Sequence, residues 1–174
     1  MVWVQREHAG ALAVVSAWVA ALLPWNVTLS TSGGAWVLFV RFPLFEFQYT
    51  SGFGAGVDGP AVRTVLSAIQ LRTGEGLELA TRLWGLGAVV ICLAVALSIA
   101  YYTEETRVES WPIHPVRLMG GLLAVSSGVF TVATWFVWTG GFGGVPIPVG
   151  VVLMALLAVV LLRAVLTDST AGPA

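Results

Sequence analysis

Long apolar runs without charge dominate the pattern of hydrophobic and polar positions along the chain. Residues 9–27 and 83–102 contain no charged residue, and neither does the longer stretch 118–162. A helix needs about 20 mostly apolar residues to cross the hydrocarbon core of a bilayer. Glycines at 140–144, with Pro146 and Pro148, interrupt the longest stretch because they permit a reversal and disfavour a continuous helix. The pattern therefore predicts four membrane-spanning helices, over residues 9–27, 83–102, 116–139 and 147–166.

Residues 30–82 form the long segment outside these predicted spans, and part of it has the period of a strand. After Pro43, aromatic side chains alternate with Glu46 and Gln48, and such alternation is typical of a half-buried strand. A turn at residues 42–45 would fold this strand back onto the apolar segment before it. Arg41 and Glu46 would then be cross-strand neighbours of opposite charge. The pattern predicts an external β-hairpin.

The rest of this segment predicts a linker followed by a short helix. Glycines at 52, 54 and 56 resemble a phosphate-binding loop superficially, but the βαβ unit that such a loop needs is not predicted, so we interpret them as a flexible connection. From Pro60 onward, apolar residues recur at helical spacing and predict a short amphipathic helix. Glu78 and Arg82 stand four residues apart and predict a favourable pair at the start of the second span.

Together these elements predict an all-α transmembrane fold. We expect a four-helix membrane bundle, with an external β-hairpin and a short amphipathic helix between its first two helices, as one membrane domain over residues 1–174. The chain is 57% hydrophobic and only 10% charged, whereas ordinary soluble domains carry about 25% charged residues. All eight basic residues are arginines and the net charge is −1, without a basic stripe. The expected surroundings are therefore a lipid bilayer, and nucleic acid is not an expected partner.

Aromatic and basic residues near the predicted span ends suggest a topology. Tryptophans at 25, 84, 135 and 138 fall at one end of the predicted bundle, where a membrane–water interface would favour them. Arginines close to the spans are concentrated on the side of the termini, so the positive-inside rule predicts cytoplasmic termini in a multi-pass cell-membrane protein. The first apolar run lacks a signal-peptide cleavage pattern and is expected to be retained.

Small residues recur every fourth position within three of the predicted spans. Such ridges let transmembrane helices approach closely, although chance also explains part of the pattern in a chain rich in alanine and glycine. The residues predicted to pack helices together are Ala13, Ala17, Cys92, Ala96, Gly120, Ala124 and Gly128.

Ionisable residues are almost missing from the predicted spans. Apart from Cys92, the ionisable residues within them are Tyr101, Tyr102, Arg117 and Arg163, all near span ends. Proton carriers and embedded hydrolases instead place carboxylates, histidines or lysines inside the bilayer. The sequence therefore predicts a protein that is not an enzyme, with no catalytic residues, no cofactor and no metal site. An enzyme acting on lipid through His114 and Glu109 is the weakest alternative.

Two functional hypotheses remain from these patterns. The first is an accessory or scaffolding subunit of a membrane or cell-envelope complex, which would bind a membrane-protein partner or self-associate. Exposed aromatic residues commonly mark such interfaces, and the candidate interface consists of Phe42, Phe45, Phe47 and Tyr49. These rings would otherwise pack on the outer end of the bundle itself. The second hypothesis is a homo-oligomeric carrier or pore for a small or lipid-like solute, lined by Ser126, Ser127, Thr131 and Thr134.

Four short motifs resemble an uncharacterised family of small haloarchaeal four-span membrane proteins. They are Met1-Val2-Trp3-Val4, Leu22-Leu23-Pro24-Trp25, Val40-Arg41-Phe42-Pro43 and Pro146-Ile147-Pro148-Val149-Gly150. The resemblance implies an archaeal cell membrane as the habitat. It implies no activity and no functional residues.

Overall fold

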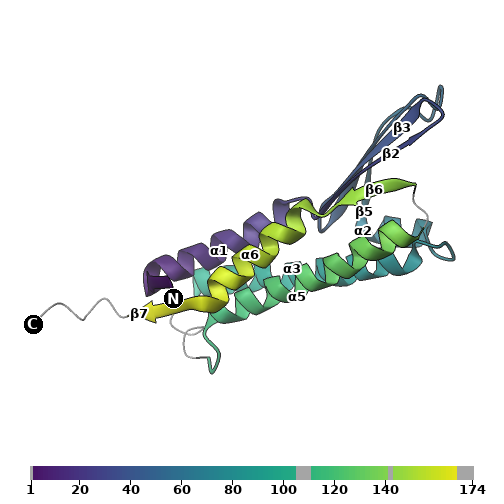
Figure 1. Ribbon diagram of the computed structural model, residues 1–174. Helices are drawn as coiled ribbons and strands as arrows, with labels where there is room; N and C mark the ends of the chain where they lie inside the picture. Colours follow the sequence, from purple (N-terminus) through teal and green to yellow (C-terminus); the bar gives the residue numbers. More distant parts are fainter. Residues whose placement is uncertain (1, 105–110, 141–142, 168–174) are drawn as a thin grey trace, which may run out of the picture.

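A five-stranded antiparallel sheet stands at one end of four long helices (Figure 1). The computed structural model describes residues 2–104, 111–140 and 143–167. In chain order its elements are β1 (Val2–Gln5), α1 (Arg6–Leu22), β2 (Asn26–Ser32), β3 (Ala35–Arg41), β4 (Phe45–Ser51), β5 (Gly59–Thr64), α2 (Val65–Leu71), α3 (Glu78–Thr103), α5 (Pro115–Thr139), β6 (Gly144–Ile147), α6 (Val149–Arg163) and β7 (Ala164–Thr167).

The predicted all-α class and four-helix membrane bundle are wrong. Only α3 and α5 are long and apolar enough to cross a membrane in the part of the chain that the structure describes. Helices α1 and α6 have 17 and 15 residues, which at about 1.5 Å per residue fall short of a hydrocarbon core about 30 Å thick. The predicted span 9–27 is too long because Asn26 and Val27 already belong to β2. Likewise, the predicted span 147–166 begins in β6 and ends in β7.

The sheet has the strand order β5-β4-β3-β2-β6, so the predicted hairpin is only its centre. The hairpin itself is confirmed, since β3 and β4 are antiparallel and Arg41 is paired with Glu46. The predicted amphipathic helix begins later than expected. Gly59–Thr64 is strand β5, and α2 starts at Val65, with the Thr64 hydroxyl accepting a hydrogen bond from the Ser67 N–H.

Strand β6 lies in the glycine- and proline-rich stretch that was predicted as a simple turn. It pairs with β2 at the edge of the sheet, where Pro146 is opposite Thr28. An edge strand tolerates proline because the N–H that proline lacks is not needed by a further neighbour. The turn prediction missed this strand because its partner lies far away in the sequence.

The long helices pack side by side, with α5 between α3 and α6, and α1 in contact with all three. At the sheet end, the Trp25 ring stacks on Phe130 with ring centroids 5.0 Å apart, and Trp84 lies 6.2 Å from Trp25. The Trp84 indole N–H donates to the carbonyls of Phe42 and Pro43 in the β3–β4 turn. These contacts fix the base of the sheet on the helix ends. At the opposite end, β1 and β7 form a parallel pair.

Candidate functional site

The two faces of the sheet have opposite chemical character. Residues directly opposite one another on adjacent strands project from the same face. One face carries the row Asn26, Arg41, Glu46 and Arg63, and we call it the inner face. The next row along the chain, which includes Val27, Val40, Phe47 and Val62, projects from the other side, which we call the outer face.

The inner face contains a buried charged cluster, which we define as Asn26, Thr28, Arg41, Glu46, Arg63 and Arg72. At its centre the Glu46 side chain is 0% exposed and that of Arg41 is 1% exposed. The Arg41 Nε donates to Glu46 Oε2 at 2.7 Å. From the same guanidinium, Nη1 donates to Asn26 Oδ1 and Thr28 Oγ1, both at 2.9 Å. Arg41 therefore links three neighbouring strands through side chains.

Two further arginines approach the same carboxylate. Arg72, at the end of α2, has its Nη2 3.4 Å from Glu46 Oε1. Arg63 on β5 has its Nη1 3.8 Å from that oxygen and also bonds to the Gln48 side chain. Three guanidinium charges thus share one carboxylate, which leaves an excess of two positive charges around Glu46.

Burial affects the protonation of Arg41, and Glu46 opposes that effect. The pKa of Arg41 is lowered to about 10, chiefly because burial desolvates the guanidinium; the Glu46 charge opposes this shift and the Arg72 charge adds to it. The resulting pKa is still well above neutral, so Arg41 is cationic at physiological pH. A buried charge of this kind is stable only when its partners remain in place.

A small cavity lies between the charged cluster and the helix ends. It has a volume of about 10 Å³ and is lined by Trp25, Arg41, Arg72, Leu77, Ala80, Thr81, Trp84 and Val137. The Trp25 side chain is 1% exposed, and within the described ranges its indole N–H has no hydrogen-bond partner. A cavity of this size holds about one water molecule or a single ion.

The outer face is apolar across the full width of the sheet. Two adjacent rows contain only apolar or aromatic residues: Ile147, Val27, Val40, Phe47 and Val62 in one, and Val145, Leu29, Leu38, Tyr49 and Pro60 in the other. Several of these side chains are strongly exposed, with Val145 at 69% and Val62 at 66%. A sheet normally buries its apolar face against another layer. Here the charged face is the buried one.

A shallow hollow adds shape to the outer face. It measures about 410 Å³ and is lined by Leu29, Thr31 and Trp36. The Trp36 ring stacks on Tyr49 with centroids 5.3 Å apart, so the wall of the hollow is held by an aromatic pair. Both edge strands contain a proline, Pro60 in β5 and Pro146 in β6. Prolines reduce the capacity of an edge to accept another strand, so the face is better suited than the edges to contact a partner.

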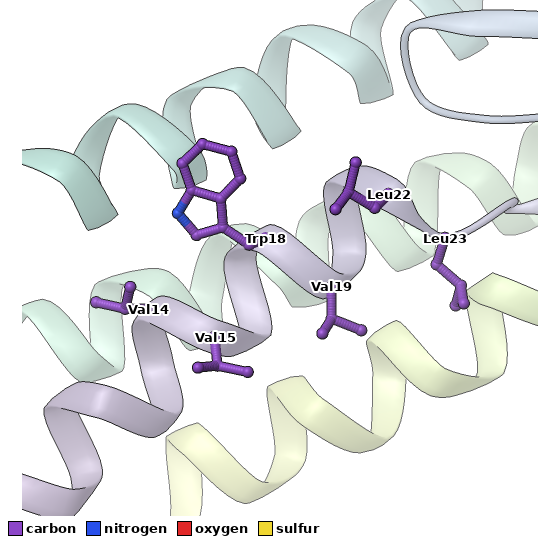
Figure 2. Close-up of a pocket in the computed structure, with 6 residues that line it drawn as sticks. All are labelled: Val14, Val15, Trp18, Val19, Leu22 and Leu23. Atoms are coloured by element: carbon purple, nitrogen blue, oxygen red, sulfur yellow. The ribbon is translucent and has the colours of Figure 1, made fainter.

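The long helices also expose apolar side chains along their outer surfaces. In the most apolar windows of α3 and α5, only 39% and 44% of the residues are buried. On α1, an apolar groove of about 380 Å³ is lined by Val14, Val15, Trp18, Val19, Leu22 and Leu23. Figure 2 shows Val15 and Val19 on the side of α1 toward α6, while Trp18 projects the other way. A helix that is apolar on its outside as well as its inside suits an apolar solvent.

The residues predicted to form a partner interface all lie at the base of the β3–β4 hairpin or along β4. Phe45, Phe47 and Tyr49 alternate with Glu46 and Gln48, so they project from the outer face. The Phe42 ring stacks on that of Phe45 with centroids 4.5 Å apart. Phe45 and Tyr49 are each 38% exposed. Most of this face could not be recognised from the sequence pattern, which does not predict β2, β5 and β6 as strands.

The residues predicted for helix packing lie in different environments. Ala13 and Ala17 on α1 are fully buried, and Gly120 on α5 lies against Leu161 of α6. By contrast, Cys92, Ala96, Ala124 and Gly128 are exposed in the structure. At these levels the buried positions of α3 and α5 are neighbouring ones such as Ile91, Ala94, Leu123 and Phe130.

The glycine-rich stretch at residues 52–56 is a loop closed by its own carboxylate. The backbone N–H groups of Gly52, Phe53 and Gly54 all donate to the side chain of Asp58. These hydrogen bonds lower the pKa of Asp58, and the one from the Phe53 N–H contributes most. Several converging amides can hold an anion, and here Asp58 supplies it. The loop is therefore better described as an internally satisfied turn than as a flexible connection.

Most residues of the two remaining hypotheses are engaged in hydrogen bonds within the protein, whereas the buried Ser126 hydroxyl has no hydrogen-bond partner among the described residues. Thr131 and Thr134 donate to carbonyls one turn earlier in α5, and Ser127 donates to the Val151 carbonyl of α6 at 3.1 Å. His114 is the N-cap of α5, where its Nδ1 accepts from the Val116 N–H. Glu109, the suggested partner of His114, lies outside the described residues.

Comparison with known proteins places the chain in a family. DUF7549, a family of unknown function, matches residues 2–166, and the chain therefore belongs to it. No curated protein matches the chain. The expected membership of an uncharacterised family is confirmed, while the haloarchaeal habitat stays a prediction.

Proposed function

We propose that this member of DUF7549 is a membrane protein in which α3 and α5 cross the lipid bilayer and the five-stranded sheet lies outside it. Their length, their lack of charge between residues 83 and 102 and between 118 and 139, and their exposed apolar surfaces support this placement. Leu86, Leu93 and Ile99 on α3 illustrate the point, since each is about half exposed. In lipid, such side chains meet a solvent of their own polarity.

Within the membrane, the protein acts as a non-enzymatic accessory or scaffolding subunit, and the outer face of the sheet binds another membrane or cell-envelope protein. The single observation that carries this proposal is the two-row apolar outer face, which spans all five strands. Its side chains are half-buried or exposed, with Leu29, Val62, Val145 and Ile147 each more than half exposed. Apolar patches of this extent on a folded protein commonly mark interaction sites.

The chemistry of the outer face favours a protein over a lipid headgroup surface as its occupant. Its two apolar rows contain no arginine or lysine, and binding to anionic headgroups draws on basic residues beside the apolar ones. The stacked Trp36–Tyr49 pair beside a hollow is instead typical of a protein interface, in which rigid aromatic anchors supply much of the binding energy.

Gentle detergent extraction of the tagged full-length protein from its native membrane tests the proposal. We expect a second protein to co-migrate in stoichiometric amount on a sizing column. The double variant Phe45→Ser with Phe47→Ser should lose that protein, because both rings belong to the outer face. Phe53→Ser is the matched control, since Phe53 is 48% exposed but lies in the β4–β5 loop.

The possible outcomes separate the alternatives. Loss of the partner from the double variant alone, with unchanged thermal unfolding, supports the proposal. A lone monomer from the native membrane, or a double variant that keeps its partner, contradicts it. A homo-oligomer would favour the carrier or pore hypothesis instead, and unfolding of the double variant would show that these rings mainly support the protein's own fold.

A further inference from the structure

Among the described residues, the charged cluster places three guanidinium groups around one carboxylate. Arg41, Arg63 and Arg72 converge on Glu46 at 2.7, 3.8 and 3.4 Å. Arg41 and Arg72 are themselves almost fully buried, at 1% and 7% exposed. Burying a charge in protein is costly unless a counter-charge accompanies it. Arg63 is 33% exposed and therefore partly solvated, but the buried Arg41 and Arg72 share one carboxylate, so a second anion beside them would improve the charge balance.

The small cavity beside the cluster has the composition of an anion site. Its lining includes both buried arginines and the indoles of Trp25 and Trp84, but not the Glu46 carboxylate. The Trp25 N–H is a buried donor without a partner in the described part of the chain. Leaving a buried donor unsatisfied is unfavourable, and an anion accepts from it while neutralising the arginines.

The size of the cavity limits what can bind. A volume of about 10 Å³ corresponds to about one water-sized particle, which is too small for a phosphate, a carboxylate or any organic ligand. Of the other lining residues, Leu77, Ala80 and Val137 are apolar, and the Thr81 hydroxyl already donates to the carbonyls of Leu77 and Glu78. An apolar wall suits a monoatomic anion that loses its hydration more readily than a multiply charged one.

We propose that this cavity binds a single halide ion, held between the Arg41 and Arg72 guanidinium groups and the Trp25 indole N–H. The ion completes the charge balance at the junction between the sheet, α2 and the helix ends. A ligand that binds the folded state alone stabilises it in proportion to the logarithm of its concentration above the dissociation constant. Halide would therefore hold the sheet on the helices. This proposal is independent of the function proposed for the outer face.

Thermal unfolding of the full-length protein in detergent tests the halide site. The melting temperature is measured across a titration of sodium chloride or sodium bromide, and sodium gluconate, whose anion is too large for the cavity, keeps the ionic strength constant. We expect the melting temperature to rise with either halide and not with gluconate. Equal melting temperatures in chloride and gluconate would overturn the proposal and leave a water molecule as the occupant of the cavity.

Two variants localise the effect. Trp25→Phe removes the N–H but keeps an aromatic ring against Phe130, and we expect the halide dependence to weaken by about tenfold in concentration, as for one lost hydrogen bond to a charged group. Arg72→Gln removes one of the two excess positive charges and should weaken it further. Trp138→Phe makes the same chemical change at an exposed position and should leave the halide dependence unchanged.

The variants also keep the proposal open to refutation if one of them fails to fold. Arg72→Gln is independent of the aromatic stack, so it decides the matter when Trp25→Phe is unstable. A halide dependence that is the same in wild type, Trp25→Phe and Arg72→Gln would place any bound halide elsewhere and overturn this site.

Discussion

The helical part and the sheet of this protein bury opposite kinds of side chain. Between the helices, the contacts are apolar and include Ala13, Leu123 and Phe130, and the helix surfaces outside are apolar as well. In the sheet, the buried face carries Arg41 and Glu46, whereas the exposed face is apolar. Two neighbouring regions of one chain therefore differ in the chemical character of the side chains that they bury.

This difference shows that exposure of apolar side chains does not by itself tell whether a surface contacts lipid or a protein partner. The helices expose apolar residues along their length, as expected of a surface in contact with lipid. The sheet exposes apolar residues on one face only, as expected of a surface that contacts a partner. Close apolar packing stabilises the helical part, whereas hydrogen-bonded charges stabilise the base of the sheet. Variants at matched positions in the two regions should separate these contributions.

The largest effect is expected from removing the shared counter-charge of the cluster. Glu46→Gln leaves the arginines around it without their carboxylate, and breaking a buried ion pair in this way destabilises proteins by about 3–5 kcal/mol. Unfolding by sodium dodecyl sulfate in mild detergent measures the change. Glu75→Gln, at an exposed position in the loop between α2 and α3, is the control and should change the free energy of unfolding by less than about 0.5 kcal/mol. Similar stabilities for the two variants would contradict the role given to Glu46.

The next largest loss of stability is expected from adding a side chain where two backbone segments approach closely in the helical part. A Cβ added at Gly150 of α6 would overlap the Pro24 carbonyl, whereas one added at Gly128 of α5 meets no atom within 4 Å. Overpacking of this kind costs about 1–3 kcal/mol, so Gly150→Ala should lower stability by that amount in the same unfolding assay. Gly128→Ala should be neutral or slightly stabilising. A neutral Gly150→Ala would mean that the junction of α1 with β2 adjusts freely.

An exposed ion pair provides the contrast to the buried cluster. Glu78 and Arg82 pair across one turn at the start of α3, with the Arg82 side chain 63% exposed. The predicted pair is confirmed, but such i,i+4 pairs contribute only about 0.3–0.5 kcal/mol. Arg82→Gln should therefore change stability by no more than this amount, and added salt should diminish the difference further. A loss comparable to that of Glu46→Gln would show that exposure is a poor guide to the strength of these pairs.

The smallest effect is expected at the β4–β5 loop and should be local. Because bonded backbone amides lower the pKa of Asp58, its ionised form favours the closed loop above the ordinary pKa of the group. That contribution is lost as the pH falls through the lowered value. Asp58→Asn should speed hydrogen exchange at Gly52–Gly54 at pH 6, measured by mass spectrometry on the matching peptide. The difference from wild type should disappear once the wild-type carboxyl is protonated. Exchange that is equal at pH 6 would exclude Asp58 as the closing group.

Local patterns predicted the parts of the fold that depend on neighbouring residues. The uncharged runs located the long helices, because helix formation and an apolar environment leave a continuous signal. The β3–β4 hairpin and the Arg41–Glu46 pair were also predictable, since alternation and a short turn set their register. The same signals misjudged the ends of α1 and α6. An apolar strand that directly precedes or follows an apolar helix extends its hydrophobic run without changing its composition.

The sequence by itself determined that long apolar helices dominate the chain and that an aromatic hairpin with one internal ion pair stands beside them. Only the tertiary structure decided that β6 joins β2, because that pairing links segments more than 100 residues apart and leaves no local pattern. It also decided which face of the sheet is buried, and it brought Arg63 and Arg72 to the carboxylate that Arg41 already bonds. The charged cluster and the apolar outer face both follow from these long-range contacts, because strand alternation fixes that two faces exist but not which one the rest of the chain covers.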